Sequence, residues 1–337
     1  MPPPVWRIYN LECNDMNRLV IQLPALNEAA SIEAVLKSLP TSLAGVDDIR
    51  MIVVDDGSTD GTGQIAASCG AHVIRHAKPR GVGAAFRSGI RRAIELGADI
   101  LVTIDADGQF ATDDVGRLVA PLLAGEADFV TGSRFKDPAL APQMPGVKRW
   151  GNDVIACWIS RLTGQDFHDV SCGFRAYSKD AFLRLNLLGD FTYTHEVFMS
   201  LAYAGLRIEE IPIKVRGVRK HGKSRVANNV WKYAWRAAGI ILGTYRDYRP
   251  LQFFGFMALA MGLAGMAAIS FLGVHWIRTG AFFPYKAVGF VGGAFCGAAL
   301  LVYLIGLVAE MQVRLRNGLE DVMFRVRRLD QHFHRHD

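Results

Sequence analysis

Two long stretches without a charged side chain constrain this 337-residue chain more than any other feature. Residues 251–277 contain no Asp, Glu, Lys or Arg, and neither do residues 287–309. Each stretch exceeds the roughly 20 apolar residues that a helix needs to cross a bilayer. A pair of buried core helices is the alternative, but uncharged runs of this length favour membrane spans. The short link between them, with Pro284, predicts a hairpin whose two ends lie on the same side.

Positive charge is concentrated beside these runs. Residues 214–249 hold ten Lys or Arg against one acid, Asp247, whereas the link between the runs has only Arg278 and Lys286. The second run is followed by Arg314, Arg316, Arg325, Arg327 and Arg328. Positive residues stay on the cytoplasmic side of a membrane. We therefore expect a multi-pass protein of the cell (inner) membrane, with the large N-terminal part and both termini cytoplasmic.

Composition and the spacing of the cysteines limit further the kinds of protein that this chain can be. Half of the residues are hydrophobic and 21% are charged, which excludes a disordered or low-complexity chain. The first 18 residues have three prolines, scattered charges and no apolar core of a signal peptide, so we expect a loose extension there. The five cysteines show no metal-like spacing and are interpreted as free thiols in a reducing compartment.

From residue 18 onward, short β-branched runs alternate with amphipathic stretches. The predicted strands are residues 19–23, 51–54, 72–74, 100–104 and 129–131, and the predicted helices are residues 31–39, 61–68, 83–96 and 113–123. Such alternation predicts a mostly parallel sheet covered by helices on both faces. Ligands of these sheets bind at the carboxyl ends of the strands. The polar motifs of the chain fall at those ends, which favours an enzyme.

After residue 132 the pattern becomes irregular. Residues 147–163 and 195–204 are predicted to be helices, and residues 207–213 a strand. Residues 226–245 predict a helix in which Trp231, Tyr233, Trp235 and Tyr245 lie among cations. Aromatic and basic residues mixed beside a membrane span are typical of an interfacial helix. A nucleic-acid surface has a similar composition, but the adjacent span favours lipid, and we expect no nucleic acid as partner.

The most informative motif is residues 103–109, TIDADGQ, which follows an apolar strand. On an extended backbone residues i and i+2 project to the same side, so Asp105 and Asp107 converge. Two carboxylates with a nearby amide oxygen suit a hard divalent cation such as Mg²⁺ or Mn²⁺, which bridges them to a substrate diphosphate. A D-x-D sequence in a surface loop has no such meaning, but its position at a strand end of an α/β pattern favours the metal interpretation.

Other polar motifs follow the remaining strands and the irregular region. They are residues 23–28 (LPALNE), 53–62 (VVDDGSTDGT), 131–135 (TGSRF), 169–177 (DVSCGFRAY), 193–196 (YTHE) and 216–225 (RGVRKHGKSR). Taken singly, each is compatible with a turn, a helix cap or an ion pair. On that interpretation Asp169 pairs with Arg134 or Arg175, and His195 with Glu196 makes a helix cap and a salt bridge. No G-x-G-x-x-G follows the first strand, which disfavours a dinucleotide oxidoreductase.

Taken together, in this order and spacing, the motifs resemble those of the family 2 glycosyltransferases. Within that family they are similar to the dolichol-phosphate mannose synthase and polyprenyl-phosphate glycosyltransferase branch. The resemblance covers about residues 18–250 and is carried by VDDGSTDGT, DADGQ, GSRF and CGFR in series. It implies an α/β fold of the GT-A type, a Rossmann-like catalytic domain that binds a nucleotide-sugar, followed here by a two-helix transmembrane hairpin.

The predicted organisation therefore has five segments. They are an N-terminal extension (1–17), a GT-A glycosyltransferase domain (18–225), a juxtamembrane interfacial helix (226–250), a transmembrane hairpin (251–311, with helices at about 251–277 and 287–309) and a cytoplasmic basic tail (312–337).

The resemblance also implies roles for individual residues on the donor side. The predicted contacts of the nucleotide base and ribose are Pro24, Leu26, Glu28, Val54 and Asp56, and the family usually has an aromatic residue at the position of Leu26. Asp105 and Ala106 are predicted to contact the donor, and Asp107 and Gln109 to ligate the metal. Arg134 is predicted to contact the transferring phosphates.

Three further arginines are matched to cations of the family. Arg149 resembles the arginine that receives the lipid phosphate. Arg219 and Arg225 match the Arg and Lys that flank the family's G-x-S-K loop, which here reads GKSR at residues 222–225. The implied partners are a nucleotide-sugar donor, a polyprenyl-phosphate acceptor and membrane lipids. Paired spans commonly associate, so a homo-oligomer is also an expectation.

The implied reaction moves a hexose from a nucleoside diphosphate, of the GDP-mannose or UDP-glucose type, to a polyprenyl or dolichyl phosphate with inversion. Asp105, Asp107, Arg134 and Asp169 are the predicted catalytic residues, Asp169 as a base or as an acceptor-orienting group. The alternatives are a membrane-anchored nucleotide-sugar-binding protein without transfer activity and a polysaccharide-synthase-type glycosyltransferase. The second normally has more spans and a Q-x-x-R-W-type motif that this chain lacks. Two spans also offer little pathway for a transporter.

Overall fold

The computed structural model describes residues 17–142, 144, 146–185, 194–216, 238–239, 242–243 and 245–336. The chain divides into two compact units, residues 1–230 with 325–337 and residues 231–324. Arg219, Arg225, residues 226–237 of the predicted interfacial helix and residues 1–16 of the predicted extension lie outside the described residues.

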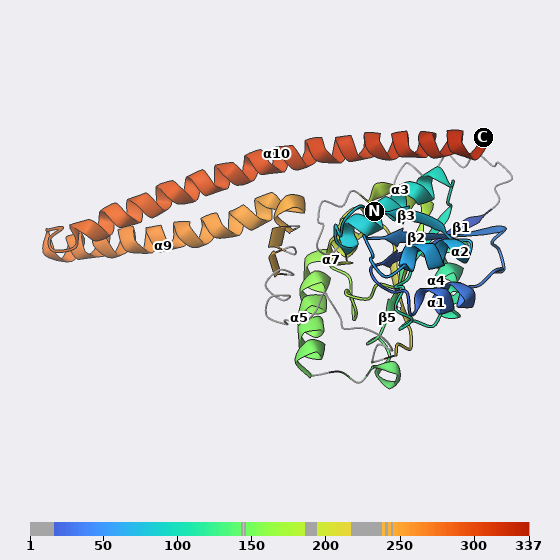
Figure 1. The fold of residues 1–337 in the computed structure, drawn as a ribbon. Helices are drawn as coiled ribbons and strands as arrows, with labels where there is room; N and C mark the ends of the chain where they lie inside the picture. Colours follow the sequence, from blue (N-terminus) through green and yellow to red (C-terminus); the bar gives the residue numbers. More distant parts are fainter. Residues whose placement is uncertain are drawn as a thin grey trace. The chain divides into compact units, whose positions relative to one another are not determined.

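The first unit is built on one seven-stranded sheet with the order β3-β2-β1-β4-β6-β5-β7. Figure 1 shows helices arranged around this sheet. Its strands are β1 (Arg18–Ala25), β2 (Asp48–Asp55), β3 (His72–Arg75), β4 (Ile100–Thr103), β5 (Phe129–Ser133), β6 (Arg175–Ser178) and β7 (Ile208–Pro212). All neighbours are parallel except β6, which is antiparallel to β4 and to β5. The predicted mostly parallel sheet is confirmed. Strand β6 was not predicted, because its four residues, RAYS, contain no β-branched side chain.

Helices cover both faces of this sheet. They are α1 (Ile32–Ser38), α2 (Thr62–Ser68), α3 (Val82–Glu95), α4 (Asp114–Leu123), α5 (Gly146–Thr163), α6 (Lys179–Arg184) and α7 (Thr194–Tyr203), with a 3₁₀ turn, η2, at Pro138–Leu140. Alternate residues of a strand face opposite sides. Leu19, Ile21 and Leu23 of β1 therefore join the core under α1, α2 and α4, and Gln22 faces Gly89 of α3 on the other side.

The second unit contains most of two long apolar helices, α9 (Pro250–Thr279) and α10 (Lys286–His336) (Figure 1). Both are long and apolar enough to cross a membrane, and only 11% and 17% of their most apolar windows are buried. A Cβ atom on Gly265 would lie 2.7 Å from the carbonyl oxygen of Gly292. The two backbones approach closely at these glycines, as in small-residue packing between membrane helices.

The predicted spans 251–277 and 287–309 fall inside α9 and α10, and α10 continues through the predicted tail to residue 336. The last residues belong to the first unit. There Arg327 donates hydrogen bonds to the carbonyl oxygens of Leu183 (2.8 Å) and Leu185 (3.0 Å).

Candidate active site

The polar motifs meet where the strand order changes direction. Strand β1 lies between β2 and β4, and the chain leaves these three parallel strands at Ala25, Asp55 and Thr103. Their loops therefore emerge at one edge of the sheet, the position where open α/β sheets bind ligands. The expectation of a shared sheet edge is confirmed for the motifs that follow β1, β2 and β4.

The loops after β1 and β2 are bonded into one surface. Asn27 has a left-handed backbone (φ 53°), which Asn tolerates better than most residues. Its amide donates to Ser58 Oγ (2.9 Å), and its side-chain oxygen accepts from the amide of Thr59 (2.8 Å). The amide of Glu28 donates to Thr62 Oγ1 (2.9 Å). The two predicted donor-binding motifs are thus held together as one structure.

Asp56 organises the neighbouring loop into α3. Its buried carboxylate accepts from the amides of Arg80 (2.9 Å) and Gly81 (2.8 Å) and lies 2.6 Å from Nδ1 of His76. Among the other predicted base contacts, Val54 has a fully buried side chain (1% exposed). Pro24, Leu26 and Glu28 are half-buried, and Pro24 pairs with Val54 in the register of β1 and β2. Sequence reasoning did not single out His76, which belongs to no motif.

The second acidic motif forms an ordered turn after β4. Asp107 is buried, and its Oδ1 accepts from the amide of Gln109 (3.0 Å). Gln109 also pairs with Arg216 through two bonds of 3.0 Å, one from its side-chain amide to the Arg216 carbonyl and one from the Arg216 amide to its own carbonyl. The segment that follows β7 is thereby attached to the predicted metal corner. Ala106 is buried, and its carbonyl accepts from Ser31 Oγ (2.8 Å).

Gly173 brings three motifs together. A Cβ atom at this position would lie 2.9 Å from Oδ1 and 3.0 Å from Oδ2 of Asp105, so the carboxylate rests against the glycine backbone. One residue later, the carbonyl of Phe174 accepts from the amide of Gly132 (2.8 Å), next to Arg134. The CGF segment therefore lies between the acidic loop and the GSRF loop. Its role was not predicted, because it arises from contacts between distant segments.

Arg134 and Asp169 form a two-pronged ion pair. Nε and Nη2 of Arg134 donate to the two carboxylate oxygens of Asp169 at 2.6 and 2.9 Å, and the Arg134 amide adds a third bond of 3.0 Å. Asp169 has no exposed surface. Burial alone would raise the pKa of this carboxyl, but the charge and hydrogen bonds of Arg134 outweigh it and hold the pKa below its usual range.

Of the two pairings that the sequence left open for Asp169, the structure has the one with Arg134. Arg175 is fully buried and instead donates to the carbonyl oxygens of Val170, Cys172 and Thr194, at 3.1, 2.8 and 3.2 Å. It thereby fixes the backbone of the loop that follows Asp169.

Glu210 of β7 supports this loop from the other side and was missed by sequence reasoning. Its carboxylate, 5% exposed, accepts from the amides of Asp169 (2.8 Å) and His168 (2.9 Å) and lies 2.8 Å from Nδ1 of His168. A carboxylate in the middle of a short strand has no pattern that indicates such a role, since its partners lie about 40 residues earlier in the chain.

A cavity of about 690 Å³ opens beside the ion pair. It is lined by residues of α5 and of the loops on either side, including Phe135, Arg149, Cys157, Arg161 and His168. The guanidinium of Arg149 lies 4.3 Å from the ring centre of Phe135, and that of Arg134 lies 5.0 Å from it. The predicted donor-side and acceptor-side arginines thus flank one ring, and Arg149 is also bonded to Asp153 (3.2 Å).

His195 packs into the core of the first unit. It is fully buried at the start of α7, and burial together with nearby Arg175 lowers its pKa to about 4. The imidazole is therefore neutral at physiological pH and belongs to the core.

The residues present fit a magnesium or manganese ion of the kind that substrate phosphates complete. Among the described residues no group of three or more His, Cys, Asp and Glu is gathered as a self-sufficient metal cage. The chain offers instead the carboxylates of Asp105 and Asp107, two residues apart in one loop. Gln109 is held in the same loop by its backbone amide, which donates to Asp107 Oδ1. Mg²⁺ is commonly held by one or two carboxylates plus phosphate oxygens, so this oxygen donor set suits it.

Comparison of the sequence with known proteins identifies glycosyltransferases as its relatives. The profile of glycosyl transferase family 2 matches residues 20–185. A UDP-N-acetylglucosamine–dolichyl-phosphate N-acetylglucosaminyltransferase of Methanococcus voltae is 33% identical over 215 residues, which cover 57% of this chain and 83% of the relative. An undecaprenyl-phosphate mannosyltransferase of Micrococcus luteus is 29% identical over 222 residues, covering 63% of this chain and 89% of the relative.

Among solved structures, glucosyl-3-phosphoglycerate synthase from Mycobacterium tuberculosis, in complex with Mn²⁺, UDP-glucose and phosphoglyceric acid, shares the fold. The TM-score is 0.54 and the identity 24%, over 68% of this chain and 80% of that one. The GT-A-like architecture predicted from the sequence is confirmed by this likeness and by the strand order.

Proposed function

The chain belongs to glycosyl transferase family 2, and on that premise we propose that it transfers a hexose from a nucleotide-sugar to a polyprenyl phosphate at a membrane surface. One observation carries the proposal. Gly173 packs against the Asp105 carboxylate while its neighbour Phe174 is bonded to Gly132, so the acidic loop and the loop of Arg134 meet at one place. A diphosphate bound there would be close to the acidic loop, whose residues would hold a cation, and to the loop that carries Arg134.

On the donor side, the loops of Asn27 and Asp56 supply a surface for the nucleoside. Asp107 and Gln109 would hold a divalent cation, with Asp105 beside it. When bound, such a cation acts as a Lewis acid that neutralises charge on the departing diphosphate. Arg134 adds a fixed positive charge at the same position, where preorganised charge contributes most to catalysis.

Asp169 is proposed to orient Arg134. Both of its carboxylate oxygens are engaged by the guanidinium, and the lowered pKa keeps it ionised. A polyprenyl phosphate is already anionic near pH 7, so its oxygen attacks the anomeric carbon without a strong general base. The new carbon–oxygen bond forms as the bond to the nucleoside diphosphate breaks, and attack opposite the leaving group inverts the anomeric configuration.

The acceptor is supported by two features of this chain. Two apolar helices of spanning length provide an anchor in the bilayer in which a long isoprenoid dissolves. Arg149 lines the cavity beside Phe135 and Arg134 and offers a cation for the lipid phosphate. The two relatives named above act on dolichyl phosphate and undecaprenyl phosphate, one with N-acetylglucosamine and the other with mannose. A screen of nucleotide-sugar donors is therefore needed to identify the sugar and the nucleotide.

The test is a transfer assay on the full-length protein in membranes. Radiolabelled GDP-mannose, UDP-glucose and UDP-N-acetylglucosamine are each offered with undecaprenyl or dolichyl phosphate, and organic-extractable label is counted. We expect one donor to give lipid-linked sugar, with loss of the product on chelation by EDTA and in Asp107→Ala. Asp113→Ala, which removes an acid at the start of α4, is the matched control and is expected to retain activity.

Two outcomes contradict the proposal. Donor binding without lipid-linked product from any donor would favour a membrane-anchored sensor of nucleotide-sugars. Wild-type rates in Asp107→Ala would refute the assignment of the metal to the acidic loop.

A further inference from the structure

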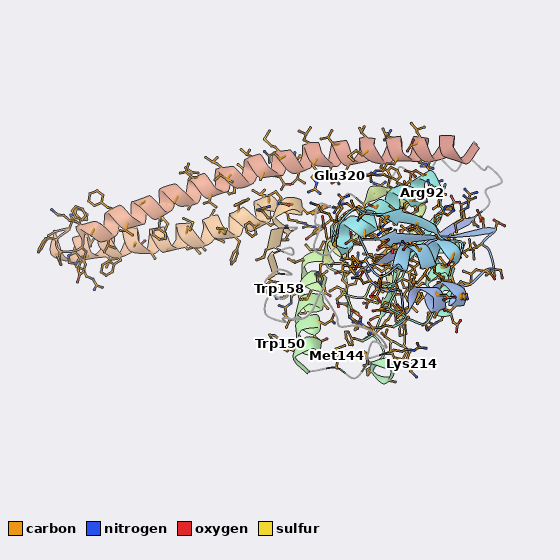
Figure 2. All side chains as sticks on the ribbon, viewed as in Figure 1. Arg92, Met144, Trp150, Trp158, Lys214 and Glu320 are labelled. Carbon is orange, nitrogen blue, oxygen red and sulfur yellow. The ribbon has the colours of Figure 1, made fainter. Side chains whose placement is uncertain are left out.

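One face of α10 carries an exposed apolar stripe that continues well beyond the uncharged run. Past residue 309 the stripe has five members, each with 56–68% of its surface exposed, and we call them the tail stripe: Leu315, Leu319, Val322, Val326 and Leu329. They are spaced four, three, four and three residues apart. Figure 2, in which Glu320 is labelled, shows the side chains along this part of the helix.

The opposite side of α10 is the one that packs on protein. In heptads that begin with Leu319 as position a, Phe324 and Gln331 occupy position f, opposite the a/d seam, and Arg327 occupies position b. Phe324 and Gln331 are buried. The side-chain amide of Gln331 donates to a backbone carbonyl just before β4, and Arg327 donates to two carbonyl oxygens at the end of α6. These contacts leave the tail stripe exposed.

We propose that the tail stripe is the seam of a parallel, two-stranded coiled coil between two copies of this chain. The inference does not depend on the reaction that the protein catalyses. It goes beyond the general expectation of a homo-oligomer, because it names the surface and the arrangement of the two helices.

The spacing of the stripe favours another helix as its partner. Apolar residues at positions a and d, repeated every 3.5 residues over three or four heptads, are typical of coiled coils. From Leu301 to Leu329, eight of the nine a and d positions hold Leu, Ile or Val. The ninth is Gln312 at a, and a polar residue at a single a position fixes the register of a coiled coil.

Orientation and charge favour a second copy of this chain. Because α10 contains a run of spanning length, two copies in one membrane cross it in the same direction, and their continuations are parallel. In a parallel coiled coil a g residue lies next to an e residue of the partner helix, five positions further on. Arg325 is at g and Asp330 is at e. Opposite charges therefore meet on both sides of the seam.

A lipid surface fits the tail stripe less well. A helix packed against a broad apolar surface presents a face at least about 100° wide, whereas a stripe of a and d positions is narrower. Here Arg316 and Arg325 lie beside the stripe at e and g. At a rise of 1.5 Å per residue, Leu315 and Leu329 are roughly 9 and 30 Å along α10 from residue 309. The helix continues from the spanning run without a break, so the stripe leads away from hydrocarbon.

Disulfide cross-linking of the full-length protein in membranes tests the seam. All five native cysteines are replaced by Ala, and one cysteine is introduced as Val322→Cys or Leu329→Cys, both at d. Arg328→Cys, exposed at position c, is the matched control. After oxidation with copper phenanthroline we expect about half of the chain to run as a dimer at positions 322 and 329, about fivefold more than at 328, because identical d residues face each other across the seam.

A second experiment measures assembly without cysteines. Two copies with different tags are expressed together, and we expect the tags to copurify in detergent and light scattering to give the mass of two chains. Leu319→Glu combined with Val326→Glu puts like charges into the seam and should reduce copurification about tenfold. Arg314→Glu combined with Arg328→Glu, both at exposed c positions, should not. The cross-linking result stands whether or not the seam variant folds.

Three results would overturn the inference. Cross-linking at positions 322 and 329 that does not exceed that at 328 would show no seam between copies. Unchanged copurification of a folded Leu319→Glu, Val326→Glu variant would place the interface elsewhere. Labelling of position 322 by a photoactivatable lipid, without a cross-linked dimer, would mean that the membrane covers the stripe.

Discussion

Replacing Asp169 by Asn tests the ion pair at the centre of the site. The change keeps the size of the side chain and removes the charge that faces Arg134 at 2.6 and 2.9 Å. Breaking a buried pair by removing one partner costs about 3–5 kcal/mol. The Arg134 side chain keeps 22% exposure, so water compensates part of its charge and we expect the lower end, about 3 kcal/mol.

A double-mutant cycle separates this pair from its surroundings. Arg134→Met alone should also cost about 3 kcal/mol, because it leaves the fully buried carboxylate of Asp169 without its cation. The double variant removes both charges, so we expect it to lose about 4 kcal/mol, which gives a coupling of about 2 kcal/mol. Urea titration of the full-length protein in detergent, read by pulse proteolysis, measures all four stabilities.

The pH dependence gives an independent check. The pKa of Asp169 is lowered in the folded protein, so its contribution is fully present above the unfolded value of about 3.9 and is lost as pH falls through the folded value. The gap between wild type and Asp169→Asn should be constant from about pH 6 to 8 and should shrink below about pH 4. Asp166→Asn, an exposed acid of the same loop, is the control and should change stability by no more than about 0.5 kcal/mol. A coupling below about 0.5 kcal/mol, or a gap that persists at low pH, would refute the reasoning.

Three other changes test separate parts of the structure. Gly173→Ala should leave stability within about 1 kcal/mol, because the Cβ atom meets a movable carboxylate, yet should displace Asp105 and lower kcat in the transfer assay; unchanged kcat would contradict the packing. Glu210→Ala should lower the free energy of unfolding by about 2–3 kcal/mol, since it leaves the amides of Asp169 and His168 without their acceptor. Glu210→Gln should lower it by less. Equal losses in urea titration would argue against this role. Gly265→Leu should separate α9 from α10 and lower the thermal stability of the purified protein. Gly255→Leu should not, because a Cβ atom added at that position meets no neighbouring atom. Equal effects of the two changes would exclude a close contact between the helices.

Much of the fold could be predicted from local sequence patterns. Apolar runs of spanning length, β-branched runs and amphipathic repeats each depend on residues close together in the chain, and all five strands predicted from residue 19 to residue 131 occur in the fold. Polar motifs at strand ends indicated where ligands bind, since the carboxyl ends of parallel strands share one edge. The prediction that Asp105 and Asp107 converge rests on their spacing alone.

Other features depend on contacts between distant segments. Strand β6 is inserted antiparallel between β4 and β5, and this pairing puts Arg175 opposite Thr103 and Thr131. The choice of Arg134 as the partner of Asp169, and the support of that loop by Glu210, arise from the same long-range packing.

The sequence by itself determined the two apolar helices, the class of sheet and the acidic motif that follows β4, because each is set by spacing along a short piece of chain. Only the tertiary structure decided which charges pair, why position 173 has no side chain, and which side of the last turns of α10 packs on the first unit. Those outcomes are fixed by close packing and by the cost of burying an unpaired charge, and both depend on neighbours that lie far away in the sequence.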